Sequence, residues 1–227
     1  MMLRTVVLAL LMSSAARVWA DASDIERLTA SDTVIKEIMA ADDKAIPGSL
    51  FQKAYCAVVI PNMKKAGFVF SAKYGRGFAS CRNPGGGWSA PSGMRVEGGG
   101  FGLQIGAQET DLILLVMSEN GMKGMLASKF TLGGEVSAAA GPVGRDVTAQ
   151  TDATLRADVL TWSRARGVFG GVSLQGGTLR ADNDVNEAIY HSKAEYKDIL
   201  TGKVKPTRDA TGFLSTLSKY GGARERK

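Results

Sequence analysis

The chain has 227 residues, of which 44% are hydrophobic, 22% charged and 7% aromatic, and its formal net charge is +6. This composition favours a single globular domain, and the 28 glycines follow no fixed period, which excludes a collagen-like protein. The positive charge suits contact with an anionic surface. Because no nucleic-acid-binding motif occurs, we expect no nucleic acid partner.

The first twenty residues have the pattern of a secretory signal peptide. Arg4 gives a positive start, residues 6–12 an apolar core, and residues 18–20 a small-residue cleavage site. The apolar run is too short to span a bilayer. We therefore expect residues 1–20 to be removed and residues 21–227 to form one exported domain, periplasmic or secreted, for which peripheral contact with a membrane stays open.

A helix is predicted from Ser23 to Ala41. Residues 23–26 fit a capping box. An apolar stripe follows, with Asp32 in its middle; its members are Ile25, Leu28, Ile35 and Met39. Such a stripe usually packs on the protein's own core. The exposed face mixes both signs of charge, which disfavours a membrane-surface helix.

The middle of the chain is rich in strands. We predict short helices from Pro47 to Lys53 and from Glu119 to Leu126, and loops or turns at residues 62–65 and 74–77. Further helices are predicted near the end at 184–192, 195–200 and 210–220. The predicted strands cover residues 55–60, 66–72, 77–82, 101–108, 111–117, 130–140, 155–162 and 168–174.

Residues 98–117 are the most strand-like stretch. From Phe101 to Gln108, apolar residues alternate with glycine and glutamine, which predicts one strand with a nearly bare face. The apolar run from Asp111 to Met117 predicts a strand buried on both faces. Strands in the middle and helices at the ends predict the α+β class: a curved antiparallel glycine-rich sheet or partial barrel covered by N- and C-terminal helices.

The chain has two cysteines, Cys56 and Cys81. In an oxidising compartment they would be able to form a disulfide. Two buried thiols that behave as small hydrophobic groups explain them equally well. Both alternatives stay open at this point.

Templates for enzymes and cofactor sites fail. His191 is the single histidine, which excludes a histidine-cluster zinc site, and a Ser-His-Asp triad would have to use it. A hydrolase alternative rests only on the presence of Asp111, Ser173 and His191. His191 fits better as a solvated residue near a helix end. The chain has no nucleophile elbow, no phosphate-binding loop of the Walker type and no EF-hand order. We expect a protein that is not an enzyme, with no cofactor and no metal.

Binding to an acidic surface is the function that remains. Five basic residues lie near predicted strand ends: Lys64, Lys65, Lys73, Arg76 and Arg82. If they converge on one rim, they suit phosphate headgroups through charge-assisted hydrogen bonds. Each cation near an anionic membrane contributes ~1 kcal/mol, so the set matters together. A solvated basic face without a ligand is the alternative.

An ordered set of segments resembles the SYLF domain family over residues 46–202. The segments are IPGSLFQKAYCAVVIP from Ile46, GRGFASCR from Gly75, GGWSAP from Gly86, GGGFGLQIGAQETDLILLVM from Gly98, AAGPVGRD from Ala139, WSRARGVFGGVSLQGGTL from Trp162, then Asn186, Tyr190 and ILTG from Ile199. The resemblance implies a non-enzymatic domain that binds acidic phospholipids, with phosphoinositides as ligands of eukaryotic members.

The resemblance also concerns proteins as partners, since yeast members of the SYLF family bind actin. We do not expect actin as a partner of an exported chain, and the protein partner is unknown. The alternative function is an envelope interaction protein that binds another protein through the glycine-rich face formed by Gly102, Gln104, Gly106 and Gln108.

Overall fold

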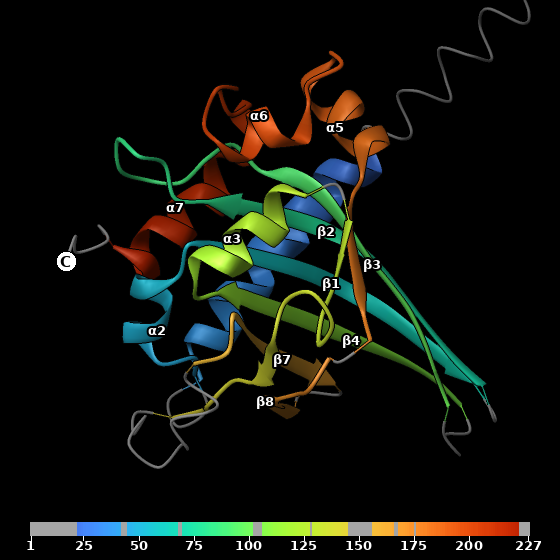
Figure 1. The fold of residues 1–227 in the computed structure, drawn as a ribbon. Helices are drawn as coiled ribbons and strands as arrows, with labels where there is room; N and C mark the ends of the chain where they lie inside the picture. The colour runs from blue at the N-terminus through green and yellow to red at the C-terminus, as the bar shows by residue number, and fades with distance from the viewer. Residues whose placement is uncertain are drawn as a thin grey trace, which may run out of the picture.

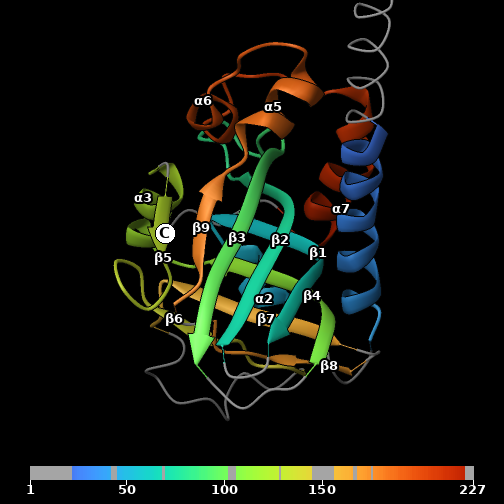
Figure 2. The ribbon, with the colours of Figure 1, turned by 90° about the vertical axis from the view of Figure 1, so that its right-hand side faces the viewer.

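The computed structural model describes residues 22–41, 45–67, 70–101, 106–127, 129–144, 156–165, 168–174 and 176–222. Its class is α+β, as predicted: one strongly curled, open sheet forms a half-barrel with helices packed on it (Figures 1 and 2). The proposed signal peptide lies outside the described residues.

Within these residues the sheet has nine strands in the order β5-β9-β3-β2-β1-β4-β7-β6, and β8 pairs with β7. All pairings are antiparallel except β6 with β7. The strands are β1 (Cys56–Gly67), β2 (Phe70–Cys81), β3 (Ser92–Phe101), β4 (Gly106–Val116), β5 (Lys129–Thr131), β6 (Ala138–Ala140), β7 (Val159–Ala165), β8 (Val168–Gly171) and β9 (Thr178–Ala181).

The helices agree closely with the predicted ones. They are the N-terminal helix (residues 22–39), α2 (Gly48–Lys53), α3 (Glu119–Leu126), α5 (Asn183–Tyr190), α6 (Tyr196–Leu200) and α7 (Thr211–Gly221), with a 3₁₀ turn, η2 (Arg208–Ala210), before α7. No helix in these ranges has the length and apolar character needed to cross a bilayer.

Two hydrophobic cores lie on opposite faces of the sheet. In β4, Ile113 and Leu115 join the core under the N-terminal helix, α2 and α7. Leu112 and Leu114 join the other core, which includes Tyr196 and Leu200 of α6. Since each buried aliphatic side chain contributes about 1.5–3 kcal/mol, the predicted burial of this strand on both faces is central to stability.

The N-terminal helix packs on the protein itself. Leu28, Ile35 and Ile38 are fully buried in the first of these cores, while Ile25 is partly exposed. Arg164 of β7 donates hydrogen bonds to Glu37 of this helix and to Asp111 of β4. The apolar stripe therefore docks on the core, as the sequence indicated.

The predicted loop at residues 62–65 is wrong, because β1 continues through Pro61 to Gly67. A β-bulge between Ile60 and Met63 accommodates Pro61 and Asn62 within the strand. Asn62 has a positive φ of 49°, and its N–H donates a hydrogen bond to the Asp111 carboxylate at 2.9 Å. A bulge is one of the few places where a sheet tolerates proline.

The predicted turn at residues 74–77 is also wrong, since these residues lie within β2. Gly77 is needed there because β1 approaches closely: an added Cβ would lie 1.9 Å from the carbonyl oxygen of Val59. Glycine within a strand often marks such a close approach of backbone.

Three further strand predictions differ from the structure. The segment 101–108 is divided between β3 and β4, which run antiparallel, and its residues 102–105 lie outside the described ranges. The segment 130–140 is divided by a turn in which Gly133 has φ 79°, so it supplies β5 and β6. Strand β9 was not predicted; its four residues carry too short a pattern to recognise.

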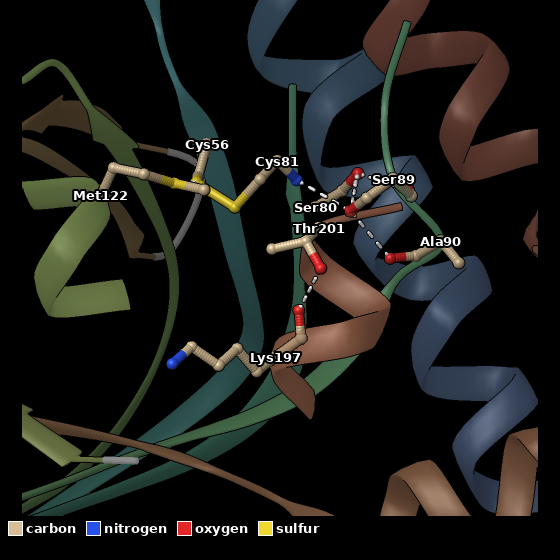
Figure 3. The surroundings of a disulfide bond; sticks show 8 residues. All are labelled: Cys56, Ser80, Cys81, Ser89, Ala90, Met122, Lys197 and Thr201. Carbon is tan, nitrogen blue, oxygen red and sulfur yellow. Dashed lines mark hydrogen bonds between the residues drawn. A yellow bond between two sulfur atoms is a disulfide. The ribbon is translucent and has the colours of Figure 1, made fainter. Parts of the chain in front are cut away.

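The structure pairs Cys56 and Cys81 in a disulfide (Figure 3). The two residues are direct cross-strand partners in β1 and β2, and both are fully buried. Sγ of Cys56 also lies 3.1 Å from Sδ of Met122 in α3. Beside the bridge, Ser89 accepts a hydrogen bond from the N–H of Cys81 and thereby anchors the loop after β2 (Figure 3).

Candidate anion-binding surface

Three of the five predicted basic residues lie together at one end of the β1–β2 hairpin. Lys64 is opposite Tyr74 and Lys65 is opposite Lys73. Because side chains alternate along a strand, Lys65 and Lys73 share one face, while Lys64 and Tyr74 share the other. We call Lys64, Lys65 and Lys73 the hairpin-end lysines.

Lys65 and Lys73 are like charges placed directly opposite each other, an arrangement that destabilises a sheet. Partial burial lowers the pKa of Lys73, and the charge of Lys65 lowers it further. In the part of the chain that the structure describes, neither lysine forms an ion pair. An external anion between the two ammonium groups would remove their repulsion.

Lys64 forms one weak, exposed ion pair. Its Nζ lies 4.0 Å from Oε1 of Glu109, and both side chains are largely exposed. An exposed pair at this distance contributes little to stability. Lys64 also lines a groove of about 460 Å³ between the hairpin and the N-terminal helix, with Tyr74, Arg76 and Glu26 among its walls.

Arg76 is held by a buried partner. Its guanidinium donates to both carboxylate oxygens of Asp182, at 2.6 and 2.9 Å, and the Asp182 side chain is completely buried. These hydrogen bonds raise the pKa of Arg76 despite its partial burial. A bidentate pair of this kind fixes geometry as well as charge, so Arg76 joins β2 to the start of α5.

Arg82 lies at the opposite end of β2 from the hairpin-end lysines. It donates to the carbonyl oxygens of Gly221 and Gly222 at the end of α7, and its guanidinium stacks 4.1 Å from the Trp88 ring centre. Positive charge at a helix C-terminus is favourable. The five predicted residues therefore do not converge on one rim: Lys65 and Lys73 share one face of the hairpin end, Lys64 and Arg76 line the groove on the other face, and Arg82 lies at the opposite end of β2.

The sequence did not single out Arg95, Arg180 and Lys129, which the sheet brings next to Arg76. Arg76 is opposite Arg95, Arg95 opposite Arg180, and Arg180 opposite Lys129. No local signal places these residues together, because β3 pairs with β9, a strand more than 75 positions away along the chain.

Two residues of the hydrolase alternative, Asp111 and His191, have structural positions. The Asp111 carboxylate accepts hydrogen bonds from Arg164 and from the N–H of Asn62. His191 is exposed at the C-cap of α5 with a left-handed backbone, which agrees with the solvated helix-end position that we predicted. Within the described ranges, no group of metal-ligating side chains is assembled.

Comparison with known proteins gives the family. Residues 97–220 match the Ysc84 family model, whose description is "Las17-binding protein actin regulator", and this is more than half of the chain. The chain belongs to the Ysc84 (SYLF) family. The resemblance that the sequence motifs indicated is thereby confirmed.

Relatives of this Ysc84 family chain occur in yeasts and mammals. It is 37% identical over 178 residues to an SH3 domain-containing protein of Schizosaccharomyces pombe, and the match covers 77% of this chain and 41% of that protein. Against the SH3 domain-containing YSC84-like protein 1 of Rattus norvegicus the identity is 32% over 179 residues, covering 78% and 52%. Against LAS seventeen-binding protein 3 of Saccharomyces cerevisiae it is 34% over 169 residues, covering 72% and 36%.

These relatives are longer proteins, of which the chain matches about half or less. Their names and the family description concern binding and regulation, and they name no enzyme. The description of the family as an actin regulator speaks against our expectation that actin is an unlikely partner of this chain.

Proposed function

We propose that this Ysc84 family domain binds acidic phospholipids, with phosphoinositide-type headgroups as the class that the family resemblance indicates. The like-charge pair of Lys65 and Lys73, which has no ion-pair partner in the described structure, carries the proposal. The strand ends that bear this pair extend away from the helices, at the lower right of Figure 1. Each cation contributes ~1 kcal/mol near an anionic membrane.

Co-sedimentation of the protein with vesicles of graded anionic content tests this proposal. We expect binding that rises with anionic lipid and weakens with salt. The double variant Lys65→Gln/Lys73→Gln should bind at least about tenfold more weakly, since two cationic contributions are lost. The matched control is Lys197→Gln/Lys205→Gln, which removes two exposed charges elsewhere. Equal loss in both variants would leave only a non-specific charge effect.

Arg76 is a poor choice for such a test. Its reversal to glutamate would leave the buried carboxylate of Asp182 beside a second negative charge, and breaking a buried pair is strongly destabilising. Arg82 is excluded for a similar reason, because its loss would free the end of α7. The lysine variants leave these structural contacts in place.

A second candidate is a protein partner concerned with actin regulation. The family description and the name of the Saccharomyces cerevisiae relative favour it. Co-sedimentation with purified actin filaments, and binding to purified Las17, test it without lipid. Saturable binding to either would support this candidate, and its absence for both would remove it. The envelope alternative rests on the glycine-rich face, whose residues 102–105 lie outside the described ranges.

We further propose export of the mature domain from residue 21 into the periplasm or medium. The signal-like pattern of residues 1–20 supports export, and so does the disulfide, since disulfides persist in oxidising compartments. Intact mass of the protein from cell fractions, measured without reductant, tests both points. A full-length, reduced chain in the cytoplasmic fraction would contradict the proposal.

A further inference from the structure

Four cations stand side by side across one face of the sheet. Lys129 of β5, Arg180 of β9, Arg95 of β3 and Arg76 of β2 occupy directly opposed positions on four successive strands. Directly opposed side chains project from the same face. With neighbouring strands about 4.8 Å apart, the four positions span about 15 Å. We call these four residues the cationic row.

The carboxylates beside the cationic row are too few to balance it. Asp182 is committed to Arg76. Glu97, two residues further along β3, pairs with two arginines. Its carboxylate lies 2.8 Å from Nε of Arg95 and 3.5 Å from Nη1 of Arg180. Two carboxylates therefore pair directly with the four cations, and a third, Asp24, acts on Arg76 but is itself paired with Arg27. Because like charges directly opposite one another repel, the row carries an unbalanced positive potential.

The contacts of the cationic row are also incomplete. Nε of Arg95 is buried, and among the described residues it has no partner with hydrogen-bond geometry, although Glu97 is close. Lys129 is exposed and forms no ion pair within the described ranges. The Arg180 side chain is 42% exposed. The ammonium group of Lys129 and the exposed guanidinium of Arg180 are thus open to an external ligand. Such a ligand would displace Glu97 from the guanidinium groups of Arg95 and Arg180.

Hydroxyl groups extend this donor set. Thr131 and Thr178 lie two residues along β5 and β9 from Lys129 and Arg180, on the same face, with their Oγ1 atoms 3.4 Å apart. One further carboxylate, Glu135, accepts a hydrogen bond from the N–H of Thr131. Guanidinium, ammonium and hydroxyl donors in one line are the groups that bind phosphate oxygens.

We propose that the cationic row is a binding site for a ligand with two or more linked phosphate groups. Arg95, Arg180 and Lys129 hold the ligand, Glu97 is the internal counter-ion that it replaces, and Arg76 fixes the end of the row through Asp182. The surplus of charge and the span of the row exceed what one phosphate needs. The residues that hold the ligand are on β3, β9 and β5, whereas the hairpin-end lysines are on β1 and β2, so the site does not depend on their binding lipid.

Titration calorimetry with inorganic tripolyphosphate tests the site. We expect the wild-type protein to bind tripolyphosphate more tightly than orthophosphate. Arg95→Gln/Arg180→Gln should lose about tenfold or more in affinity, because a charge-assisted hydrogen bond contributes more to the binding free energy than a neutral one. Lys129→Gln, at an exposed position that folding does not require, should weaken binding several-fold. Glu97→Gln should strengthen it. The control Lys197→Gln/Lys205→Gln, which removes two exposed charges elsewhere, should bind tripolyphosphate as the wild type does.

Vesicles of phosphatidylcholine with phosphatidylinositol bisphosphate distinguish the source of the phosphates. If tripolyphosphate competes with vesicles and Lys129→Gln weakens both, the row takes the lipid headgroup. If Lys129→Gln weakens tripolyphosphate binding alone, the row takes a soluble ligand; this site then stands even where no vesicles bind and the lipid proposal fails. Unchanged tripolyphosphate affinity in both Lys129→Gln and Arg95→Gln/Arg180→Gln, or no wild-type binding at all, would overturn the site.

Discussion

Asp158, just before β7, gathers the hydrogen bonds that join three segments. Its carboxylate accepts from Ser118, the N-cap of α3, from the side chain of Asn120, and from both the N–H and the hydroxyl of Ser137. Burial alone would raise the pKa of Asp158, but these hydrogen bonds outweigh it and hold the pKa below its ordinary value. The ionised carboxylate is therefore the form that the fold requires.

At the scale of this residue we predict that Asp158→Asn lowers the free energy of unfolding at pH 7 by about 1 kcal/mol, a modest value because the site is largely solvated. A depressed pKa gives stability above the unfolded pKa that is lost as pH falls through the folded one. The difference from wild type should therefore shrink below about pH 4. Urea unfolding at pH 7 and pH 3 measures this difference in unfolding free energy, and Glu187→Gln at an exposed position is the control. The same difference at both pH values would contradict the lowered pKa of Asp158.

At the scale of the element, the β1–β2 hairpin depends on the close approach of two backbones at the bulge. Gly77 faces the carbonyl of Val59 at a distance that no side chain fits, and Gly75 lies against Ile60 and Met63. On the other side of β1, the Asp111 carboxylate of β4 accepts a hydrogen bond from the N–H of Asn62 in the bulge. The bulge sets which face the hairpin-end lysines occupy, because a one-residue shift moves every later side chain to the other face.

We predict that Gly77→Ala destabilises the protein by about 3 kcal/mol or more, since the added methyl meets fixed backbone rather than a side chain that can turn away. Gly48→Ala, at the first position of α2 with open space around it, is the matched control and should be neutral or slightly stabilising. Thermal unfolding of both variants gives the comparison. Similar stability in both would mean that β1 and β2 lie further apart at the bulge.

At the scale of the whole molecule, the disulfide is the one covalent link between strands in the described structure, and it lies where β1 and β2 enter the second core. It closes a loop of 25 residues. In the chain-entropy account, a loop of this size corresponds to about 3 kcal/mol of stabilisation. Both sulfur atoms are buried between α3 and the sheet, so they also contribute as packed apolar groups.

We predict that Cys56→Ala/Cys81→Ala lowers the free energy of unfolding by about 3 kcal/mol relative to the oxidised wild type. The reduced wild type should fall between the two, because it loses the link but keeps the volume of the sulfur atoms. Guanidinium unfolding with and without reductant measures this order. Identical curves for the oxidised and reduced wild type would show that the bridge does not stabilise the fold.

The sequence by itself determined the features that depend on neighbours along the chain. The helices, the α+β class and the strand buried on both faces agree with the structure, since capping residues and hydrophobic periodicity act over a few positions. The ordered motifs also indicated the family, which the comparisons confirmed.

Only the tertiary structure decided how the strands pair and where the cations lie. The alternating pattern of residues 101–108 begins at the end of β3 and continues into β4, so the pattern does not mark where one strand ends. The glycines of β2 resemble a turn in the sequence, and only the close approach of β1 explains them. Tertiary packing likewise places Arg76 against Asp182 and Arg82 at the end of α7. Strand pairing aligns Arg95, Arg180 and Lys129. The physical reason is that register between distant segments arises from long-range packing, which leaves no local pattern in the sequence.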